Sequence, residues 1–258
     1  MTDLSKKHYK ITGLIIRKRH FFETDKIIYI FSKERGILQA NVRSARKSTS
    51  KLSGLTELFT YGHFEIVKGK NLDILISAKP IRHFEKATKD LEKISDYYII
   101  CEIIQKLLPE MVENQKIFYE TLSIFEFLNE KESKPTVFYI YKLIVLLGYG
   151  LDLRQCCMCK RIPKESKRRY LSFEDGSLLC ENCANGNGQK MITPEEIKIL
   201  DFIQSSDFEK YSRLKMPNII REGITNLIFG YLEHIYQKEF KSRRFSNDLK
   251  KLSRNTKK

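Results

Sequence analysis

Long apolar runs are missing from this sequence of 258 residues, which argues against a membrane-spanning helix. A span needs about 18 apolar residues, whereas one of the longest apolar stretches, Ile140 to Leu147, is far shorter and contains Lys142. The opening residues, MTDLSKKHYK, lack the apolar segment of a secretory signal peptide, and no lipidation motif is present. We therefore expect a soluble protein of a reducing, cytoplasmic compartment.

Sequence motifs of the common enzyme classes are missing as well. The chain has neither a G-x-x-x-x-G-K-[ST] phosphate loop nor a G-x-S-x-G nucleophile elbow. His63-Phe64-Glu65 has the H-x-E pattern of zinc deaminases, but that chemistry also requires a following P-C-x-x-C and an open zinc position. Gln155 stands where that proline would be. We expect His63 to be a strand side chain and the protein not to be an enzyme.

Positive charge is abundant but confined to the two ends of the chain. Residues 1–83 contain 17 Lys and Arg against 7 Asp and Glu, and residues 238–258 contain 9 against 2. The segment between them contains 21 against 23, although the whole chain has a net charge of +15. A charge that served only solubility would spread along the chain, so this segregation favours a polyanionic partner, nucleic acid first. A basic membrane-surface protein is the main competitor, but it would need an amphipathic basic helix or a lipid anchor.

The first 83 residues predict a small β-barrel. Apolar and β-branched runs separated by turn signals indicate five strands, over Tyr9–Arg17, Lys26–Phe31, Gly36–Val42, Thr60–Val67 and Leu72–Ala78. Five strands in so short a segment fit a closed barrel, and the OB-fold is the commonest such choice. A long connector, Arg43–Leu58, separates the third and fourth strands and starts basic.

Beyond Phe84 the apolar pattern changes to a helical period. Helices are predicted over Leu91–Leu108, Ile117–Leu128, Thr136–Leu147, Pro194–Gln204 and Asn218–Gln237. We expect an α+β protein in which an N-terminal OB-fold β-barrel (residues 1–82) precedes an α-helical domain in two parts (83–151 and 191–240). A four-cysteine, zinc-ribbon-like module (152–190) is inserted between those parts, and a basic tail (241–258) follows.

Four cysteines have the spacing of a structural zinc site. Cys156 and Cys159 form one C-x2-C pair, Cys180 and Cys183 form another, and 20 residues separate the pairs, as in four-thiolate zinc ribbons. Two such turns can complete a tetrahedron of sulfurs at about 2.3 Å from zinc, which leaves no position for a catalytic water. Asp175-Gly176 is a hairpin turn signal that would bring the second pair back to the first. We expect one structural Zn²⁺.

Other readings of the cysteines are weaker. Disulfides are disfavoured in a reducing compartment, and unligated thiols would not explain the regular spacing. Cys157 makes the first pair ambiguous, but the x2 spacing selects Cys156, in which case Cys157 points away from the metal. Cys101 lies on the apolar face of a predicted helix, where a packing role is expected.

A basic cluster opens the connector, with Arg43, Arg46, Lys47 and Lys51 beside small residues that leave phosphates accessible. Lys and Arg contacts to phosphate give salt-dependent affinity without sequence preference. Further cations are expected at strand ends, namely Arg17, Lys18, Arg19, Lys33 and Arg35. Three aromatics lie near them and are candidates for stacking on bases, although most aromatics of a small barrel belong to its core: Phe21, Phe22 and Tyr29.

In order and spacing, these features resemble the bacterial RecO family of recombination-repair proteins, over nearly the whole chain. The resemblance is carried by Gly13–Arg17, Glu23–Lys26, Arg35–Leu38, Arg43–Lys47, Ser50–Leu52, Leu147–Gly150, the four cysteines, His234 and Lys241–Arg243. It implies an OB-fold followed by a helical domain with a zinc module. It also implies binding to single- and double-stranded DNA, annealing of complementary strands, and a mediator role in which the protein works with RecR, and often RecF, to load RecA onto strands coated by single-strand binding protein.

Residue by residue, the resemblance implies that Arg43, Arg46, Lys47 and Lys51 contact DNA and that the four cysteines bind zinc. We add Arg17, Arg19 and Arg35 as DNA contacts. The family usually has glycine at the position of Ser44, so a different local backbone is expected there. Some family members lack the cysteines, which favours a structural rather than a mechanistic zinc.

The last helix and the tail are expected to hold the acidic C-terminal tail of single-strand binding protein. The candidate cations are Arg221, Lys238, Lys241, Arg243 and Arg244. We expect the protein in the bacterial cytoplasm, associated with the nucleoid. Two alternatives remain: an RNA- or ribosome-associated zinc-ribbon protein, and an enzyme with a zinc-stabilised structure that acts on nucleic acid.

Overall fold

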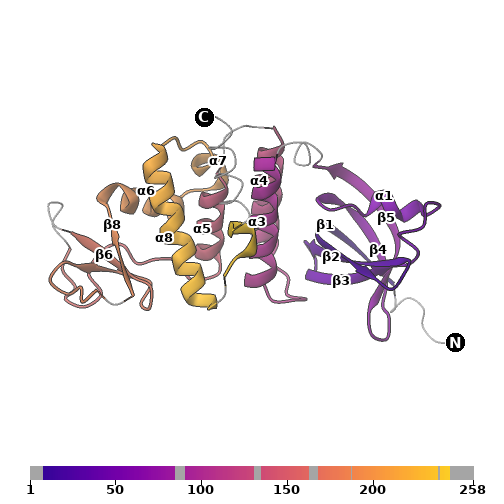
Figure 1. Cartoon of the computed structure of the whole chain (residues 1–258), viewed down its shortest axis with the longest axis horizontal. Helices are drawn as coiled ribbons and strands as arrows, with labels where there is room; N and C mark the ends of the chain where they lie inside the picture. The colour runs from indigo at the N-terminus through magenta and orange to yellow at the C-terminus, as the bar shows by residue number, and fades with distance from the viewer. Residues whose placement is uncertain are drawn as a thin grey trace. The chain divides into compact units, whose positions relative to one another are not determined.

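The computed structural model divides the chain into two compact units, Met1–Glu132 with Ser242–Lys258 and Ser133–Lys241 (Figure 1). The residues that it describes are 8–84, 91–130, 135–162, 168–186, 188–237 and 239–244. The first unit contains a five-stranded barrel and helices, and the second contains a three-stranded sheet and helices. This mixed architecture confirms the predicted α+β class.

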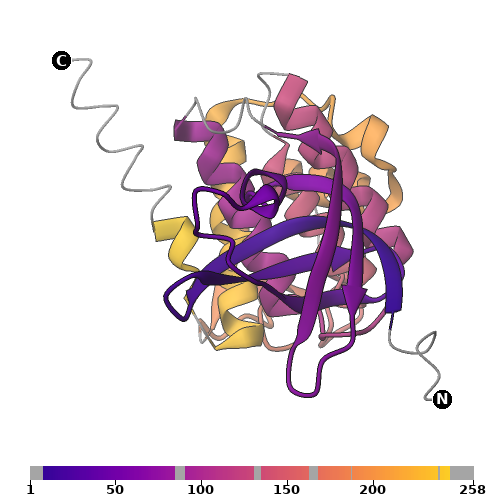
Figure 2. The ribbon, with the colours of Figure 1, turned by 90° about the vertical axis from the view of Figure 1, so that its right-hand side faces the viewer.

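The barrel has the strand order of an OB-fold. Its strands are β1 (His8–Phe21), β2 (Asp25–Ser32), β3 (Gly36–Val42), β4 (Thr60–Val67) and β5 (Asp73–His83), and they close in the order β1-β2-β3-β5-β4 (Figure 2). The long strand β1 pairs with both β2 and β4, and β3 pairs with β5 in the parallel direction. A closed five-stranded barrel with this connectivity confirms the OB-fold.

Two facing glycines allow β1 to change partners. Gly13 pairs with Gly62 of β4 and with Ser32 of β2. A Cβ atom on Gly13 would lie 2.5 Å from a side-chain carbon of Ile30, and one on Gly62 would lie 2.6 Å from the carbonyl oxygen of Lys79. Because a side chain at either position would collide with a neighbouring strand, glycine permits the close approach that closes the barrel.

Inward-facing aliphatic and aromatic side chains fill the barrel, as the alternation in β4 illustrates. Phe64 and Ile66 of that strand are fully buried, whereas His63 between Gly62 and Phe64 is exposed. The connector after β3 contributes a short helix, α1 (Lys51–Leu55), whose Leu52 and Leu55 pack against the same core. The sequence did not predict this helix, because five residues are too few to show a helical period.

Strand β1 runs further than the sequence suggested. It continues to Phe21, because Lys18, Arg19 and His20 pair with Ile28, Ile27 and Lys26 of β2. Arg17 and Arg19 therefore lie within a strand, and the prediction that they stand at a strand end is wrong. The run Arg17–His20 is exposed throughout, so it lacks the apolar alternation by which a strand is recognised.

Two helices, α3 (Leu91–Leu107) and α4 (Gln115–Glu130), complete the first unit and share an aromatic core with the barrel. The ring of Tyr97 on α3 meets that of Phe125 on α4 edge-on at 4.5 Å, and its hydroxyl donates to the Phe125 carbonyl at 2.8 Å. Phe59 and Phe84, which flank the last two barrel strands, pack against the same pair. Edge-to-face packing of this kind adds to the stabilisation from burial alone.

The second unit contains α5 (Thr136–Leu146), β6 (Arg169–Ser172), β7 (Ser177–Cys180), β8 (Gln189–Ile192), α6 (Pro194–Ser205), α7 (Phe208–Tyr211) and α8 (Asn218–Tyr236). Helix α5 is buried over most of its length, in agreement with its apolar sequence. A capping box begins α6: the Thr193 hydroxyl accepts from the Glu196 N–H at 3.2 Å, and the Glu196 carboxylate accepts from the Thr193 N–H at 2.9 Å.

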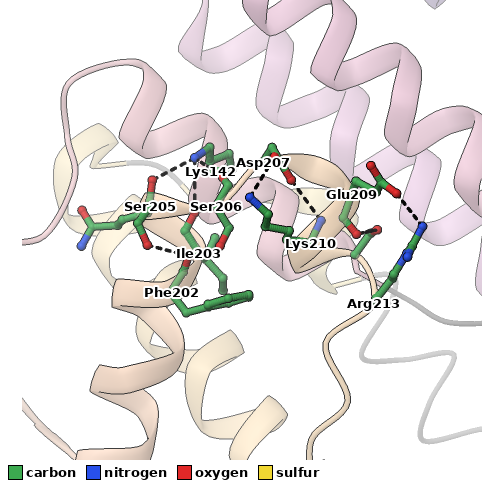
Figure 3. A network of polar contacts seen from close by, with 11 residues as sticks. Lys142, Phe202, Ile203, Ser205, Ser206, Asp207, Glu209, Lys210 and Arg213 are labelled. Atoms are coloured by element: carbon green, nitrogen blue, oxygen red, sulfur yellow. Dashed lines mark hydrogen bonds and ion pairs between the residues drawn. The ribbon is translucent and has the colours of Figure 1, made fainter.

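Lys142 interrupts the apolar sequence of α5 because it caps another helix. Its Nζ donates to the carbonyl oxygens of Ile203 at 3.3 Å, Gln204 at 2.9 Å and Ser206 at 2.5 Å (Figure 3). These carbonyls belong to the end of α6, where helical partners run out and a positive charge is favourable. The buried lysine therefore ties α5 to the C-terminus of α6.

None of the helices that the structure describes is both long and apolar enough to cross a membrane.

Candidate metal centre and nucleic-acid interface

The four cysteines of the C-x2-C pairs gather at one point of the second unit. The Sγ atoms of Cys156, Cys159, Cys180 and Cys183 all lie within 4.8 Å of one another, and the Cys159 and Cys180 sulfurs are 3.8 Å apart. A regular tetrahedron with metal–sulfur distances of about 2.3 Å requires sulfurs about 3.8 Å apart. The cluster could therefore hold one metal ion with all four protein ligands.

Backbone turns and the β6–β7 hairpin position the sulfurs. In the first pair the Lys160 N–H donates to the Cys156 carbonyl at 2.9 Å, and Lys160 adopts a positive φ of 59° that closes the turn. In the second pair the Cys183 N–H donates to the Cys180 carbonyl at 3.0 Å. Cys180 is the last residue of β7 and pairs with Arg169 of β6. The hairpin thus returns the second pair to the first, as its turn signal predicted.

The thiols influence one another strongly. Burial raises the pKa of Cys156, but hydrogen bonds from backbone N–H groups, including those of Cys159 and Cys180, lower it by more. The net effect is a pKa of about 6, below the ordinary value of a thiol. A hydrogen bond with the Cys180 side chain, together with burial, raises the pKa of Cys183 to about 12. Four thiols this close cannot all ionise unless a cation balances their charge, and a tetrahedral set of four sulfurs suits Zn²⁺.

Cys157 lies outside the cluster. Its sulfur is 3.9 Å from the Asp175 carboxylate, and its N–H donates to the Leu178 carbonyl at 2.8 Å. Burial, followed by the nearby Asp175 charge, raises the pKa of its thiol. Cys101 is buried in α3, and burial raises the pKa of that thiol. The x2 spacing therefore selected the sulfurs that meet.

The basic connector is fastened to the turn between β1 and β2. The carboxylate of Asp25 accepts from the Ser44 N–H at 2.8 Å and from the Asn41 side chain at 3.0 Å. The backbone N–H of Arg46 donates to the Thr24 carbonyl at 2.9 Å, and its guanidinium donates to the Glu23 carbonyl at 2.7 Å. These bonds fix where the connector leaves β3. The anchoring role of Asp25 was not predicted from the sequence, although the turn-forming pair Thr24-Asp25 was a usable signal.

Ser44 has a left-handed backbone with φ of 51°. Glycine adopts this conformation freely, whereas for other residues it costs roughly 1 kcal/mol. The position thus has the backbone that glycine favours, contrary to the expectation of a different local conformation. The Asp25 bond to the Ser44 N–H is what holds the serine there.

The strand register separates the cationic candidates into groups. Lys26 of β2 faces both His20 of β1 and Val42 of β3, so Arg19 and Arg43 lie at the same end of these strands. Arg35 lies in the β2–β3 turn at the opposite end, about 20 Å away along β2. The connector cations and Arg19 therefore form one basic group, which we call the connector cluster: Arg19, Arg43, Arg46, Lys47 and Lys51.

Two other candidates are engaged with aromatic rings. The Arg17 guanidinium carbon lies 5.1 Å from the centre of the Tyr29 ring, and that of Arg35 lies 4.3 Å from the Tyr9 ring. Both arginines remain exposed. They can still offer charge to a phosphate: Arg17 lies two residues before Arg19 on the same face of β1, whereas Arg35 lies at a site distinct from the connector cluster.

The connector cluster retains its positive charge. Within the part of the chain that the structure describes, Arg19, Arg43 and Lys47 are exposed and form no ion pair. By contrast, Lys18 and the buried Lys26 both pair with Glu57. Unpaired exposed cations on an anchored segment are suited to phosphate contacts.

The candidates for partner binding do not form one group. Arg221 is half-buried in the first turn of α8, where its guanidinium lies 5.8 Å from the Phe138 ring. Lys241 is exposed and follows α8, whose last residue, Tyr236, lies about 22 Å along the helix from Arg221. Arg243 and Arg244 belong to the first unit. They follow Ser242, whose backbone N–H donates to the Glu102 carboxylate of the same unit. Lys238 lies outside the described residues.

Two family models match this chain and together cover nearly all of it. The model of the recombination protein O N-terminal domain matches residues 6–84, and that of the C-terminal domain matches residues 88–244. The chain belongs to the recombination protein O (RecO) family. It is 30% identical to a protein of Dehalococcoides mccartyi strain BAV1 named DNA repair protein RecO, over 93% of this chain and 95% of that one. A RecO protein of Roseiflexus sp. is 30% identical over 95% of this chain and 87% of that one. One of Caldanaerobacter subterraneus is 29% identical over 93% of this chain and 98% of that one.

Proposed function

We propose that this RecO-family protein acts in DNA repair as a recombination mediator that binds single- and double-stranded DNA and anneals complementary strands. The observation that carries the proposal is the connector cluster, whose exposed cations lack ion-pair partners among the described residues and whose backbone is anchored through Asp25 and Arg46. The names of the relatives support DNA repair as the process.

Annealing by such a surface requires charge neutralisation rather than bond-making, so the proposed role is not enzymatic. Two complementary strands repel one another through their phosphates. Cations that contact phosphates of both strands lower this repulsion and release bound counterions. Arg35 lies away from the connector cluster and is proposed to guide the flanking DNA, whereas Arg17 is proposed to extend the cluster along β1.

We further propose a division of labour along the chain. Residues 1–82 would bind DNA, the helical parts (83–151 and 191–240) and the tail (241–258) would bind protein partners, and residues 152–190 would form the zinc module. The family relationship suggests RecR, RecF and RecA as partners, at the nucleoid. The acidic tail of single-strand binding protein suits the cations after α8, Lys241, Arg243 and Arg244.

One Zn²⁺ is the metal that best fits Cys156, Cys159, Cys180 and Cys183. When bound, it would supply structural cross-linking, because four thiolates leave no open position for water. The residues of the module hold the β6–β7 hairpin against the first cysteine pair. The proposed role of the zinc ion is therefore to stabilise the fold and not to contact DNA.

The connector cluster is tested by reversing charges. We expect the triple variant Arg43→Glu/Arg46→Glu/Lys47→Glu to lose affinity for a labelled single strand in anisotropy titrations over a range of salt concentrations. Each lost phosphate contact lowers the slope of log affinity against log salt by about 0.7. A matched control, Lys68→Glu/Lys70→Glu/Lys79→Glu, changes the net charge equally at exposed positions elsewhere on the barrel. Equal losses in both variants, or an unchanged slope in the first, would refute the assignment.

The same titration separates the proposed function from an RNA-binding role. A DNA and an RNA strand of one sequence are compared under identical salt. Binding to DNA at least as tight as to RNA supports the DNA repair role, and a strong preference for RNA contradicts it.

A further inference from the structure

Phe22 stands out among the aromatic residues of the barrel because it is 78% exposed. It follows the last residue of β1, in the turn that leads to β2, and its φ is 48°. A bulky side chain rarely adopts this left-handed conformation, so the position is strained. Strain at an exposed aromatic is not explained by core packing and points to a role outside the core.

A neighbouring ring supports the exposed one. The ring centre of Phe21 lies 4.3 Å from that of Phe22, with the two planes tilted by 57°. Phe21 is itself partly buried. The pair therefore fixes the orientation of the Phe22 ring while its outer face stays open to solvent.

The connector cluster lies directly beside this turn. The carbonyls of Glu23 and Thr24, the next two residues after Phe22, accept the side-chain and backbone bonds of Arg46. Arg19 precedes Phe21 by two residues and is exposed. An open aromatic face thus stands next to cations suited to phosphates, which is the combination that single-strand binding surfaces use.

The other aromatics near the cations are already engaged. Arg17 covers Tyr29, and Arg35 covers Tyr9, whose hydroxyl donates to Asp73. Neither ring presents a free face of the kind that Phe22 presents. Of the aromatics considered from the sequence, Phe22 is the one placed to meet a base.

We propose that Phe22 stacks on an unpaired nucleobase of a strand whose phosphates the connector cluster holds. The inference rests on the proposed DNA-binding function and assigns to that site its preferred ligand, single-stranded nucleic acid with exposed bases. In a duplex the bases are already stacked and paired, so Phe22 contributes nothing to duplex binding. The connector cluster binds phosphates in either form, and Phe22 supplies the preference for the single strand.

The test uses the full-length protein and three probes of equal length: oligo(dT), an oligo of abasic sites with the same phosphates, and a duplex. We expect Phe22→Ala to weaken oligo(dT) binding roughly tenfold and to leave binding to the abasic oligo and the duplex unchanged. Phe22→Leu keeps an apolar side chain without a π face and should behave like Phe22→Ala. Phe22→Tyr should retain the binding of the native protein.

A spectroscopic readout is available because the chain contains no tryptophan. In the variant Phe22→Trp, oligo(dT) should quench the new fluorescence, whereas the abasic oligo should not. Unchanged oligo(dT) affinity in Phe22→Ala, or an equal loss on the abasic oligo, would overturn the stacking role. If the connector triple variant still loses affinity in that case, the DNA-binding function stands and only the stacking inference fails.

Discussion

The carboxylate of Asp25 accepts a hydrogen bond from the backbone N–H of Ser44 at 2.8 Å, across 19 residues of sequence. This bond joins the beginning of β2 to the first residues of the basic connector. It places the connector cations next to the β1–β2 turn and holds Ser44 in a left-handed conformation. The position of the proposed DNA-binding site thus depends on one acidic side chain.

Removal of this anchor should lower stability in a pH-dependent way. The Asn41 bond, followed by the Ser44 N–H, lowers the pKa of Asp25 below its ordinary 3.8. A carboxyl whose pKa is lower in the folded protein stabilises the fold above its unfolded pKa, and this stabilisation is lost as the pH falls through the folded pKa. Asp25→Ala should therefore melt at a lower temperature than the native protein at pH 7, and the difference should shrink below pH 4. A difference independent of pH would contradict the role of the charged carboxylate.

Ser44→Gly should stabilise the protein, because glycine relieves the cost of the left-handed backbone. About 1 kcal/mol is expected, equivalent to an increase in melting temperature of about 2–4 °C for a chain of this size. Ser44→Ala, which keeps the strain, serves as the control and should not be stabilised. If glycine lowers the melting temperature, the serine side chain contributes something that its backbone conformation does not reveal.

Lys142→Met should destabilise the second unit by about 2–3 kcal/mol, because buried carbonyls at the end of α6 lose their donor. Urea unfolding monitored by circular dichroism measures the change. Lys210→Met is a suitable control, since its ammonium pairs with Asp207 at the surface, 3.4 Å away, where such pairs contribute little. Figure 3 shows both lysines in the same network. Similar losses in the two variants would argue against a capping role for Lys142.

Metal content should distinguish the adjacent cysteines. The native protein and Cys157→Ser should each contain about one zinc per chain, whereas Cys159→Ser should bind it weakly. Chelation of the native protein should lower the melting temperature of the second unit first, with DNA affinity retained while the barrel stays folded. Loss of DNA binding from a chelated protein that remains folded would show that the zinc module takes part in the interface.

Much of the fold could be predicted because local patterns encode it. The alternation in β4 and the turn signals between strands specified the barrel, and the C-x2-C spacing specified which sulfurs meet. Strand β8 was not predicted, since Lys190 and Met191 in its centre are both exposed and it has no apolar alternation. The prediction also ended the first strand at Arg17 and left out Lys18–His20, because that run pairs through its backbone while exposing every side chain.

The candidate site was less accessible from sequence. The run of basic residues identified the connector cations. The bond between Asp25 and Ser44 and the ion pair between Lys18 and Glu57, however, join residues that are distant in the chain. No local pattern reveals them. The separation of Arg35 from the connector cluster likewise follows from strand register, which only the folded barrel establishes.

Strand annealing is the most direct test of the central claim, that the connector cluster enables two strands to meet. Complementary strands are coated with the cognate single-strand binding protein, and duplex formation is followed by fluorescence energy transfer. The native protein and the variant Lys68→Glu/Lys70→Glu/Lys79→Glu should accelerate annealing, and Arg43→Glu/Arg46→Glu/Lys47→Glu should not. Annealing by the last variant at the native rate would contradict the account.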